Sequence, residues 1–209
     1  MAGRYIAARM IVVLGRPRAA RRPGTPGVVA PAPAGLCVSI ARAAVQAGAS
    51  VELVGSIGDD AAGDEVIVGL SRLGIGHAAM LRDPAARTPE PETPHADLPR
   101  LERGDVELGL GYLVEFSVLL LAEPLESDAE AAALDGAAFH GAQVVAVLPR
   151  GVAPDERLAS VGTVLEAPED DGGAFGGLVG RFAVELERGT PGADGLARAA
   201  VATGWERRS

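Results

Sequence analysis

The stretch "AGLCVSIARAAVQAGASVELVGSIGDDAAGDEVIVGLSRLGI", residues 34–75, alternates apolar segments of helix length and strand length. Residues 38–47 predict a helix that ends before Gly48, and residues 50–55 predict a strand. A second helical pattern follows and stops at Gly74. Helices that alternate with strands are typical of a parallel sheet covered by helices, so this stretch predicts an α/β protein.

The same alternation continues over the rest of the chain. We expect further strands at residues 10–15, 117–123, 142–149 and 162–167. We expect further helices from Ser127 to His140, with a capping box of Ser127 and Glu130, over the apolar stripe from Phe175 to Leu186, and after Thr190 and Pro191. Residues 82–104 are rich in proline and charge and predict an irregular excursion. Together with residues 16–33 they could form a small β lid over one edge of the sheet.

Length and charge restrict the class of protein. A chain of 209 residues that is 48% hydrophobic can bury one substantial core, so we expect a single domain over residues 1–209. The formal net charge of -9 and the scattered arginines disfavour nucleic acid as a partner. Arg16, Arg18, Arg21 and Arg22 form the one basic cluster, and the prolines beside them predict a solvated loop rather than an anion site.

Missing residue types exclude several kinds of site. The chain contains no lysine and no asparagine, which excludes the P-loop and protein-kinase designs for binding nucleotides. A single cysteine, Cys37, excludes an internal disulfide and predicts a small buried hydrophobe, and the three histidines lack ligand spacing, so we expect no metal site. No apolar segment is long enough to span a bilayer and no signal-peptide cleavage region is evident, so we expect no membrane partner and a cytoplasmic location.

Residues 34–75 resemble the sugar-binding half of PfkB, or ribokinase-like, carbohydrate and nucleoside kinases. The family pattern is a diglycine, a nearby asparagine that opens a helix, an "LGA" turn, a strand and "VGxxGxDxxG". The positions of this chain that match it are Gly35, Gly48, Gly55, Gly58, Asp60 and Gly63. The resemblance continues over residues 119–149, with Glu123 where many members place a glutamate that contacts substrate, and over "DDGGAFGGLVGRFAVELERG", residues 170–189.

This resemblance implies a doubly wound, mostly parallel sheet with flanking helices and a small β lid. It also implies transfer of the γ-phosphoryl group of ATP to a sugar-like alcohol with Mg²⁺, with an aspartate as general base and an anion hole of backbone amides at a helix amino end. Carried over by position, the substrate-binding residues would be Gly35, Ser39 and Glu123, and the anion hole would be Gly172 and Gly173. The residues also have simpler interpretations, since the glycines suit tight turns and Glu123 could be solvated or capping.

The chain departs from the family where catalysis would occur. Aligning Ala174 and Phe175 with the family's Ala-Phe places Gly173 at the catalytic aspartate, whereas a register shift of two would bring Asp171 there. Ser39 replaces the family's asparagine. The junction between the last predicted strand and the "DDGGAF" segment is shorter than the ~30 residues of one βαβ unit, so most of the nucleotide-binding segment is expected to be missing.

We therefore hypothesise a non-catalytic, pseudokinase-like protein that binds a sugar- or nucleoside-like ligand, or acts as a regulatory or scaffold dimer, with no cofactor. The alternative is an active sugar or nucleoside kinase with a shortened nucleotide site, using ATP, Mg²⁺ and Asp171. We expect a homodimer, because an exposed lid edge would seek a partner for its backbone groups.

Overall fold

The computed structural model describes residues 10–20, 32–90, 93–168 and 173–205. Its centre is a six-stranded, all-parallel sheet in the order β5-β4-β1-β6-β7-β8. The strands are β1 (Met10–Leu14), β4 (Val51–Gly58), β5 (Met80–Asp83), β6 (Phe116–Leu121), β7 (Gln143–Pro149) and β8 (Gly162–Ala167). The chain is thus an α/β protein with the doubly wound parallel sheet that the sequence predicts.

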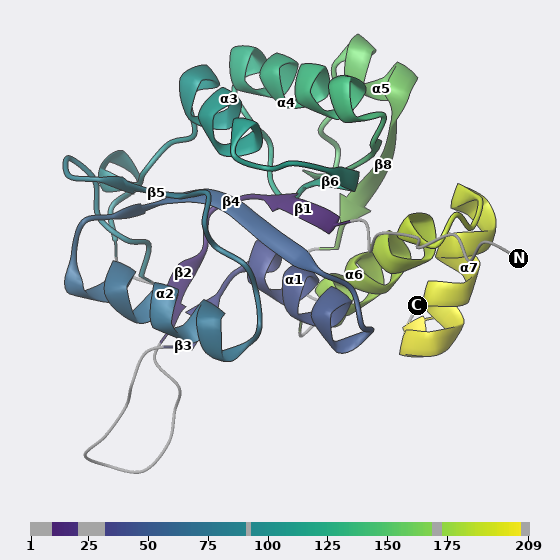
Figure 1. The fold of residues 1–209 in the computed structure, drawn as a ribbon, viewed down its shortest axis with the longest axis horizontal. Helices are drawn as coiled ribbons and strands as arrows, with labels where there is room; N and C mark the ends of the chain where they lie inside the picture. Colours follow the sequence, from purple (N-terminus) through teal and green to yellow (C-terminus); the bar gives the residue numbers. More distant parts are fainter. Residues whose placement is uncertain (1–9, 21–31, 91–92, 169–172, 206–209) are drawn as a thin grey trace, which may run out of the picture.

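Helices cover both faces of this sheet (Figure 1). One face carries α1 (Leu36–Gln46), α2 (Ala61–Arg72) and α6 (Ala174–Glu187), and α7 (Gly192–Thr203) packs against α6. The other face carries α3 (Arg103–Gly111), α4 (Ser127–His140) and α5 (Glu156–Val161).

The alternation of side chains along β1 divides the core into two layers. Ile11 and Val13 point into the cluster under α1, α2 and α6, whereas Val12 and Leu14 point into the cluster under α3 and α4. All four side chains are fully buried. A central parallel strand that is apolar on both faces requires helices on both faces, and β1 has them.

A second, two-stranded antiparallel sheet lies beside the carboxyl edge of the main sheet. It pairs β2 (Arg18–Ala20) with β3 (Ala32–Ala34). The backbone amide of Ala19 donates a hydrogen bond of 2.8 Å to the carbonyl of Pro89, so β2 contacts the chain after β5, as the two segments of the expected lid would require. A lid function for them stays a prediction.

The structure corrects three local predictions. Residues 82–104 are not wholly irregular, since β5 ends at Asp83 and pairs with β4, and α3 begins at Arg103. The capping box at the start of α4 is wrong, because the N-cap is Glu126, which makes no side-chain cap. The solvated loop predicted for the arginine cluster is wrong for Arg16, whose side chain is half-buried in an ion pair.

Close packing explains three glycines of the stretch 34–75. A Cβ atom at Gly55 would lie 2.3 Å from the carbonyl oxygen of Gly15, and one at Gly58 would lie 2.5 Å from the backbone nitrogen of Thr88. A Cβ atom at Gly63 would lie 2.5 Å from the carbonyl oxygen of Gly58. These glycines are therefore required because backbone segments meet there.

Candidate functional site

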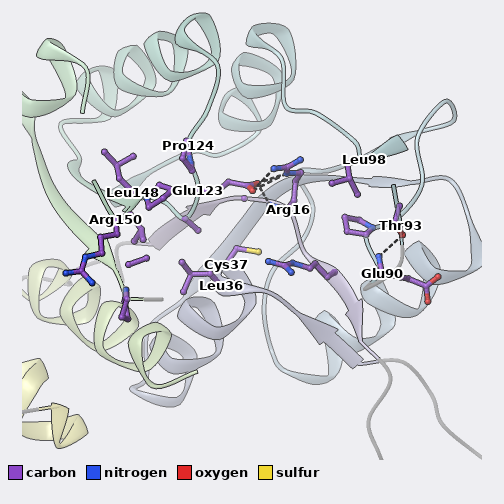
Figure 2. A pocket seen from close by; sticks show the side chains of 18 residues that line it. Arg16, Leu36, Cys37, Glu90, Thr93, Leu98, Glu123, Pro124, Leu148 and Arg150 are labelled. Atoms are coloured by element: carbon purple, nitrogen blue, oxygen red, sulfur yellow. Dashed lines mark hydrogen bonds and ion pairs between the residues drawn. The ribbon is translucent and has the colours of Figure 1, made fainter. Parts of the chain in front are cut away.

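An open cleft of about 620 Å³ lies at the carboxyl edge of the main sheet (Figure 2). The two neighbours of β1 in the sheet are β4 and β6. The chain continues from β1 to β4 on one side and later returns to β6 on the other, so the strand order reverses at β1. Ligands of open α/β sheets bind at such a switch point. The cleft lining comes from the ends of β1, β6, β7 and β8, the start of α1 and Arg18 of β2, together with Pro89, Glu90, Thr93 and Leu98.

Glu123 and Arg16 form a bidentate ion pair in this cleft. Arg16 Nη2 donates to Oε2 of Glu123 at 2.9 Å, and Arg16 Nε lies 3.0 Å from Oε1 and 3.1 Å from Oε2. The backbone amide of Arg16 donates to Oε1 at 2.7 Å. Both side chains are about a quarter exposed (27% and 25%), so the pair is partly desolvated. Two parallel hydrogen bonds fix the orientation of the carboxylate as well as neutralising its charge.

Cys37 lies at the start of α1 and also lines the cleft, although its residue is only 2% exposed. Burial, and next the negative charge of Glu123, raise the pKa of the Cys37 thiol to about 12. The sulfur is therefore a neutral thiol at physiological pH and is no nucleophile. The sequence-based prediction of a buried small hydrophobe is confirmed.

The wall of the cleft that contains Pro89 and Glu90 is anchored through Thr88. The Thr88 hydroxyl donates to Oδ1 of Asp60 at 2.7 Å and accepts from the amide of Gly58 at 3.1 Å, while the Thr88 amide donates to Oδ2 of Asp60 at 2.9 Å. Asp60 also caps α2 by accepting from the amide of Gly63 at 2.8 Å. The Asp60 carboxylate thus joins the start of α2 to the wall of the cleft.

Burial opposes ionisation of Asp60, but the hydrogen bonds from Thr88 and Gly63, helped by the charge of Arg87, outweigh that effect and lower the pKa of Asp60. Asp60 is therefore a carboxylate at neutral pH. Asp60 matches the aspartate of the family pattern, and in this chain that position has a structural role.

The residues predicted from the family pattern fall in different places. Glu123 lines the cleft, and Gly35 is the N-cap of α1 beside it, with a φ of 104° that favours glycine. Ser39 lies on the face of α1 that packs against α6, where a Cβ at Gly176 would approach the Ser39 Cβ to 2.5 Å. Gly173 is the N-cap of α6 with a φ of 83°.

Two predicted residues, Asp171 and Gly172, lie outside the described residues, as does Asp170. The structure therefore does not test the alternative base or one half of the predicted anion hole.

Sequence reasoning missed the arginines of the cleft and its anchor. Arg16, Arg18 and Arg150 line the cleft, and Thr88 holds its wall. One signal could have found Arg16 and Arg150, since each follows closely after a predicted strand and so belongs to the carboxyl edge of a parallel sheet. Nothing local identifies Thr88, whose partner Asp60 is 28 positions away.

Over the described ranges, no group of three or more His, Cys, Asp or Glu side chains is arranged to hold a metal ion. Within the same ranges, no helix has the length and apolar character needed to cross a membrane.

No family model matches this chain, and no curated protein matches its sequence. Solved structures do match its fold. Aminoimidazole riboside kinase from Salmonella enterica superposes with a TM-score of 0.64 at 13% identity, over 94% of this chain and 92% of that chain. A candidate ribokinase from Agrobacterium tumefaciens gives a TM-score of 0.60 at 16% identity, over 94% and 90% of the two chains.

A candidate sugar kinase from Clostridium perfringens gives a TM-score of 0.67 at 11% identity, over 93% of this chain and 88% of that chain. Identities this low carry the fold and leave the activity open. The chain therefore has the ribokinase-like fold of sugar and nucleoside kinases, with its cleft at the carboxyl edge of the sheet.

Proposed function

We propose that this chain is a ribokinase-like binding protein that holds a sugar- or nucleoside-like ligand in the cleft and transfers no phosphate. The observation that carries the proposal is Gly173. The family pattern aligns this position with the catalytic aspartate, and here it is a glycine in the left-handed conformation at the amino end of α6. That residue offers no carboxylate to take a proton from a substrate hydroxyl, which typically contributes ~10²–10⁴ in rate.

The short connection before α6 supports the same proposal. Strand β8 ends at Ala167 and α6 begins at Ala174. The intervening residues are fewer than the ~30 that one additional βαβ unit requires, so this junction cannot hold further strands and helices around a nucleotide.

The state of Glu123 supports binding without catalysis. Both of its carboxylate oxygens accept hydrogen bonds from Arg16, so the carboxylate is fixed in the cleft as part of an ion pair. Both oxygens already act as acceptors for Arg16, so fewer of their lone pairs remain for the proton of a ligand hydroxyl. Glu123 can orient a ligand hydroxyl but is poorly placed to replace the missing aspartate.

The test is a thermal-shift panel of sugars and nucleosides, each with and without ATP and Mg²⁺, followed by a product assay on every ligand that shifts the melting temperature. The proposal expects stabilisation by at least one sugar or nucleoside that does not depend on ATP, and no phosphorylated product. Formation of product would overturn it and select the alternative, an active kinase, in which Asp171→Asn should abolish turnover.

A scaffold role is the second candidate, because large apolar side chains are exposed just after α3 and near the end of α4. Tyr112 is 66% exposed, Val114 93% and Phe139 86%, and α3 and α4 pack against each other. Apolar surface that is exposed in one region often marks a protein contact. The expected homodimer would give twice the 21.2 kDa chain mass in light scattering. If the chain is a monomer at micromolar concentration and binds a ligand, the scaffold role is contradicted and the binding function stands.

A further inference from the structure

We propose that the ligand of the cleft carries an oxyanion, a carboxylate or a phosphate, on a hydroxylated small molecule, and that Arg18 is the main residue that recognises it. This inference rests on the proposed binding function and names its ligand class. A neutral sugar would leave the charge of the cleft uncompensated.

The charge of the cleft is opposite to that of the whole chain. The chain has a formal charge of -9, yet among the residues that the structure describes, three arginines, Arg16, Arg18 and Arg150, line the cleft against two acids, Glu90 and Glu123. Arg16 neutralises Glu123, and the carboxylate of Glu90 points away from the middle of the cleft (Figure 2). The positive charge that remains belongs to Arg18, and to Arg150, whose partner Glu166 lies 3.5 Å away in an exposed pair.

Arg18 has no ion-pair partner among the residues whose placement the structure describes. Its side chain crosses the start of α1, since a Cβ atom at Gly35 would lie 3.8 Å from Arg18 Nε and Cγ. Its positive charge is close enough to the buried Cys37 thiol to act on the pKa of that group, which it lowers slightly against the larger effect of burial. A guanidinium with all its donors available at the mouth of a cleft matches carboxylate and phosphate geometry.

The other two arginines can contribute as well. Arg16 binds Glu123 through Nε and Nη2, and its Nη1 group makes no hydrogen bond within the part of the chain that the structure describes. Arg150 lies 3.5 Å from Glu166 in a pair whose side chains are 71% and 59% exposed. Exposed pairs of this kind contribute little to stability, so Arg150 can exchange Glu166 for a ligand.

The start of α1 adds a weaker contribution to the arginines. Its N-cap is Gly35, so no side chain caps the first backbone amides, and its first turn contains no acidic residue. Leu36 and Cys37 bring this helix end into the cleft lining. The positive end of the helix dipole therefore reinforces the attraction of the arginines for an anion.

The size and the remaining lining define the rest of the ligand. A cleft of about 620 Å³ falls in the range of roughly 300–1,000 Å³ that holds small molecules. Leu36, Leu148 and Pro124 give it apolar surface beside the arginines. A sugar acid, a sugar phosphate or a nucleoside monophosphate fits this combination better than a free inorganic ion.

The experiment measures the affinity of the full chain by calorimetry for matched sets of probes. The sets are glucose, gluconate and glucose 6-phosphate; ribose and ribose 5-phosphate; and adenosine and adenosine monophosphate, with inorganic phosphate alone as a further arm. We expect one or more anionic probes to bind at least tenfold more tightly than the neutral member of its set. That advantage should fall as salt is raised, because the attraction is electrostatic.

Two variants assign the effect to the cleft. Arg18→Gln should weaken the anionic probe about tenfold and leave the neutral probe unchanged, whereas Arg42→Gln, an exposed arginine on α1 that does not line the cleft, should change neither. Circular dichroism confirms that both variants fold. Equal affinity for neutral and anionic members, or equal losses in the two variants, would overturn the oxyanion inference and keep the binding function.

The remaining outcomes separate the sources of the effect. Binding of inorganic phosphate as tightly as of the phosphorylated probes would overturn the assignment of a hydroxylated ligand. A carboxylate preference in the glucose set would indicate a sugar acid, and a phosphate preference would indicate a sugar or nucleoside phosphate. Binding of no probe at all would overturn the proposed function, and this inference with it.

Discussion

The guanidinium of Arg16, just after β1, holds the carboxylate of Glu123, just after β6, through two side-chain nitrogens and its own backbone amide. The two residues are 107 positions apart in the chain. Because β1 and β6 are neighbours in the sheet, the pair joins the chain entering the β2–β3 sheet to the loop that leads to α4. It is both a structural contact and the charged centre of the cleft.

Glu123→Gln should destabilise the protein by about 1–3 kcal/mol, because hydrogen bonds to a charged group are lost and Arg16 keeps its charge without a partner. Urea unfolding at neutral pH measures the change. Glu166→Gln is the matched control, since its pair with Arg150 is exposed and 3.5 Å long, and it should change stability by less than about 0.5 kcal/mol. If both substitutions change the free energy of unfolding equally, the pair of Arg16 and Glu123 stabilises the protein no more than an exposed pair does.

Thr88→Val should cost about 1–3 kcal/mol at neutral pH, because valine has the shape of threonine but removes the hydroxyl that donates to Asp60 Oδ1 and accepts from the amide of Gly58. Thr88 is only 2% exposed, so water cannot easily replace them. Thr163→Val makes the same chemical change at an exposed position of β8 and should be nearly neutral. A Thr88 variant as stable as the Thr163 variant would contradict the anchoring role.

The pH dependence of that cost should follow Asp60. Burial works against its ionisation, yet the hydrogen bonds from Thr88 and Gly63 lower the pKa of Asp60 in the folded state below its unfolded value. A depressed carboxyl pKa adds stability that is present above the unfolded pKa and is lost as the pH falls through the folded pKa. The difference between the parent chain and Thr88→Val should therefore be largest near pH 7 and shrink from about pH 5 to pH 3. If the stability difference between the two proteins is constant over that pH range, the effect of Thr88 does not depend on the ionisation of Asp60.

Cys37 should resist thiol reagents in the folded protein. Burial first, and the charge of Glu123 second, raise its pKa to about 12, so the reactive thiolate is scarce at pH 8. A colorimetric thiol assay should show slow labelling in buffer and rapid labelling of one thiol in urea. Glu123→Gln removes only the smaller cause and should leave the thiol slow. Fast labelling of the folded parent chain would mean that the start of α1 opens readily.

Strand-length segments rich in apolar residues predict five of the six strands of the main sheet and miss the edge strand β5, which has only four residues and is partly exposed. The sequence pattern also does not predict β2 and β3, which are three residues each, or α5, which is six residues long. Elements this short depend on tertiary contacts, as the bond from Ala19 to Pro89 illustrates. The capping box at Ser127 fails for a related reason, since the helix begins one residue early and Ser127 already lies inside it.

The candidate site is less predictable than the fold, because its contacts cross the sequence. Glu123 could be named from its place after a strand and from the family pattern. Its partner Arg16 also follows a strand, but nothing in the sequence pairs it with Glu123, which is 107 positions away, until β1 and β6 lie side by side. The arginine composition of the cleft, and with it the oxyanion inference, emerges only from the folded chain.

The approach of α6 to α1 depends on glycine, and this gives a prediction in which two neighbouring substitutions act with opposite sign. A Cβ at Gly180 would lie 2.4 Å from the carbonyl oxygen of Ile40 and 2.8 Å from the Cβ of Ala43, whereas nothing lies within 4 Å of a Cβ at Gly177. Gly180→Ala should cost about 1–2 kcal/mol net, because overpacking of roughly 1–3 kcal/mol exceeds the helix propensity that alanine gains.

Gly177→Ala should stabilise the same helix by about 0.5–1 kcal/mol, since it gains propensity without a clash. Parallel urea titrations of the two variants measure both effects. Stabilisation by both substitutions would mean that α1 and α6 can separate without penalty. Leu36 and Cys37 of α1 line the cleft, so a shift of α1 would change its shape. Gly180→Ala should therefore also lower the affinity for any ligand that Arg18 binds, whereas Gly177→Ala should not.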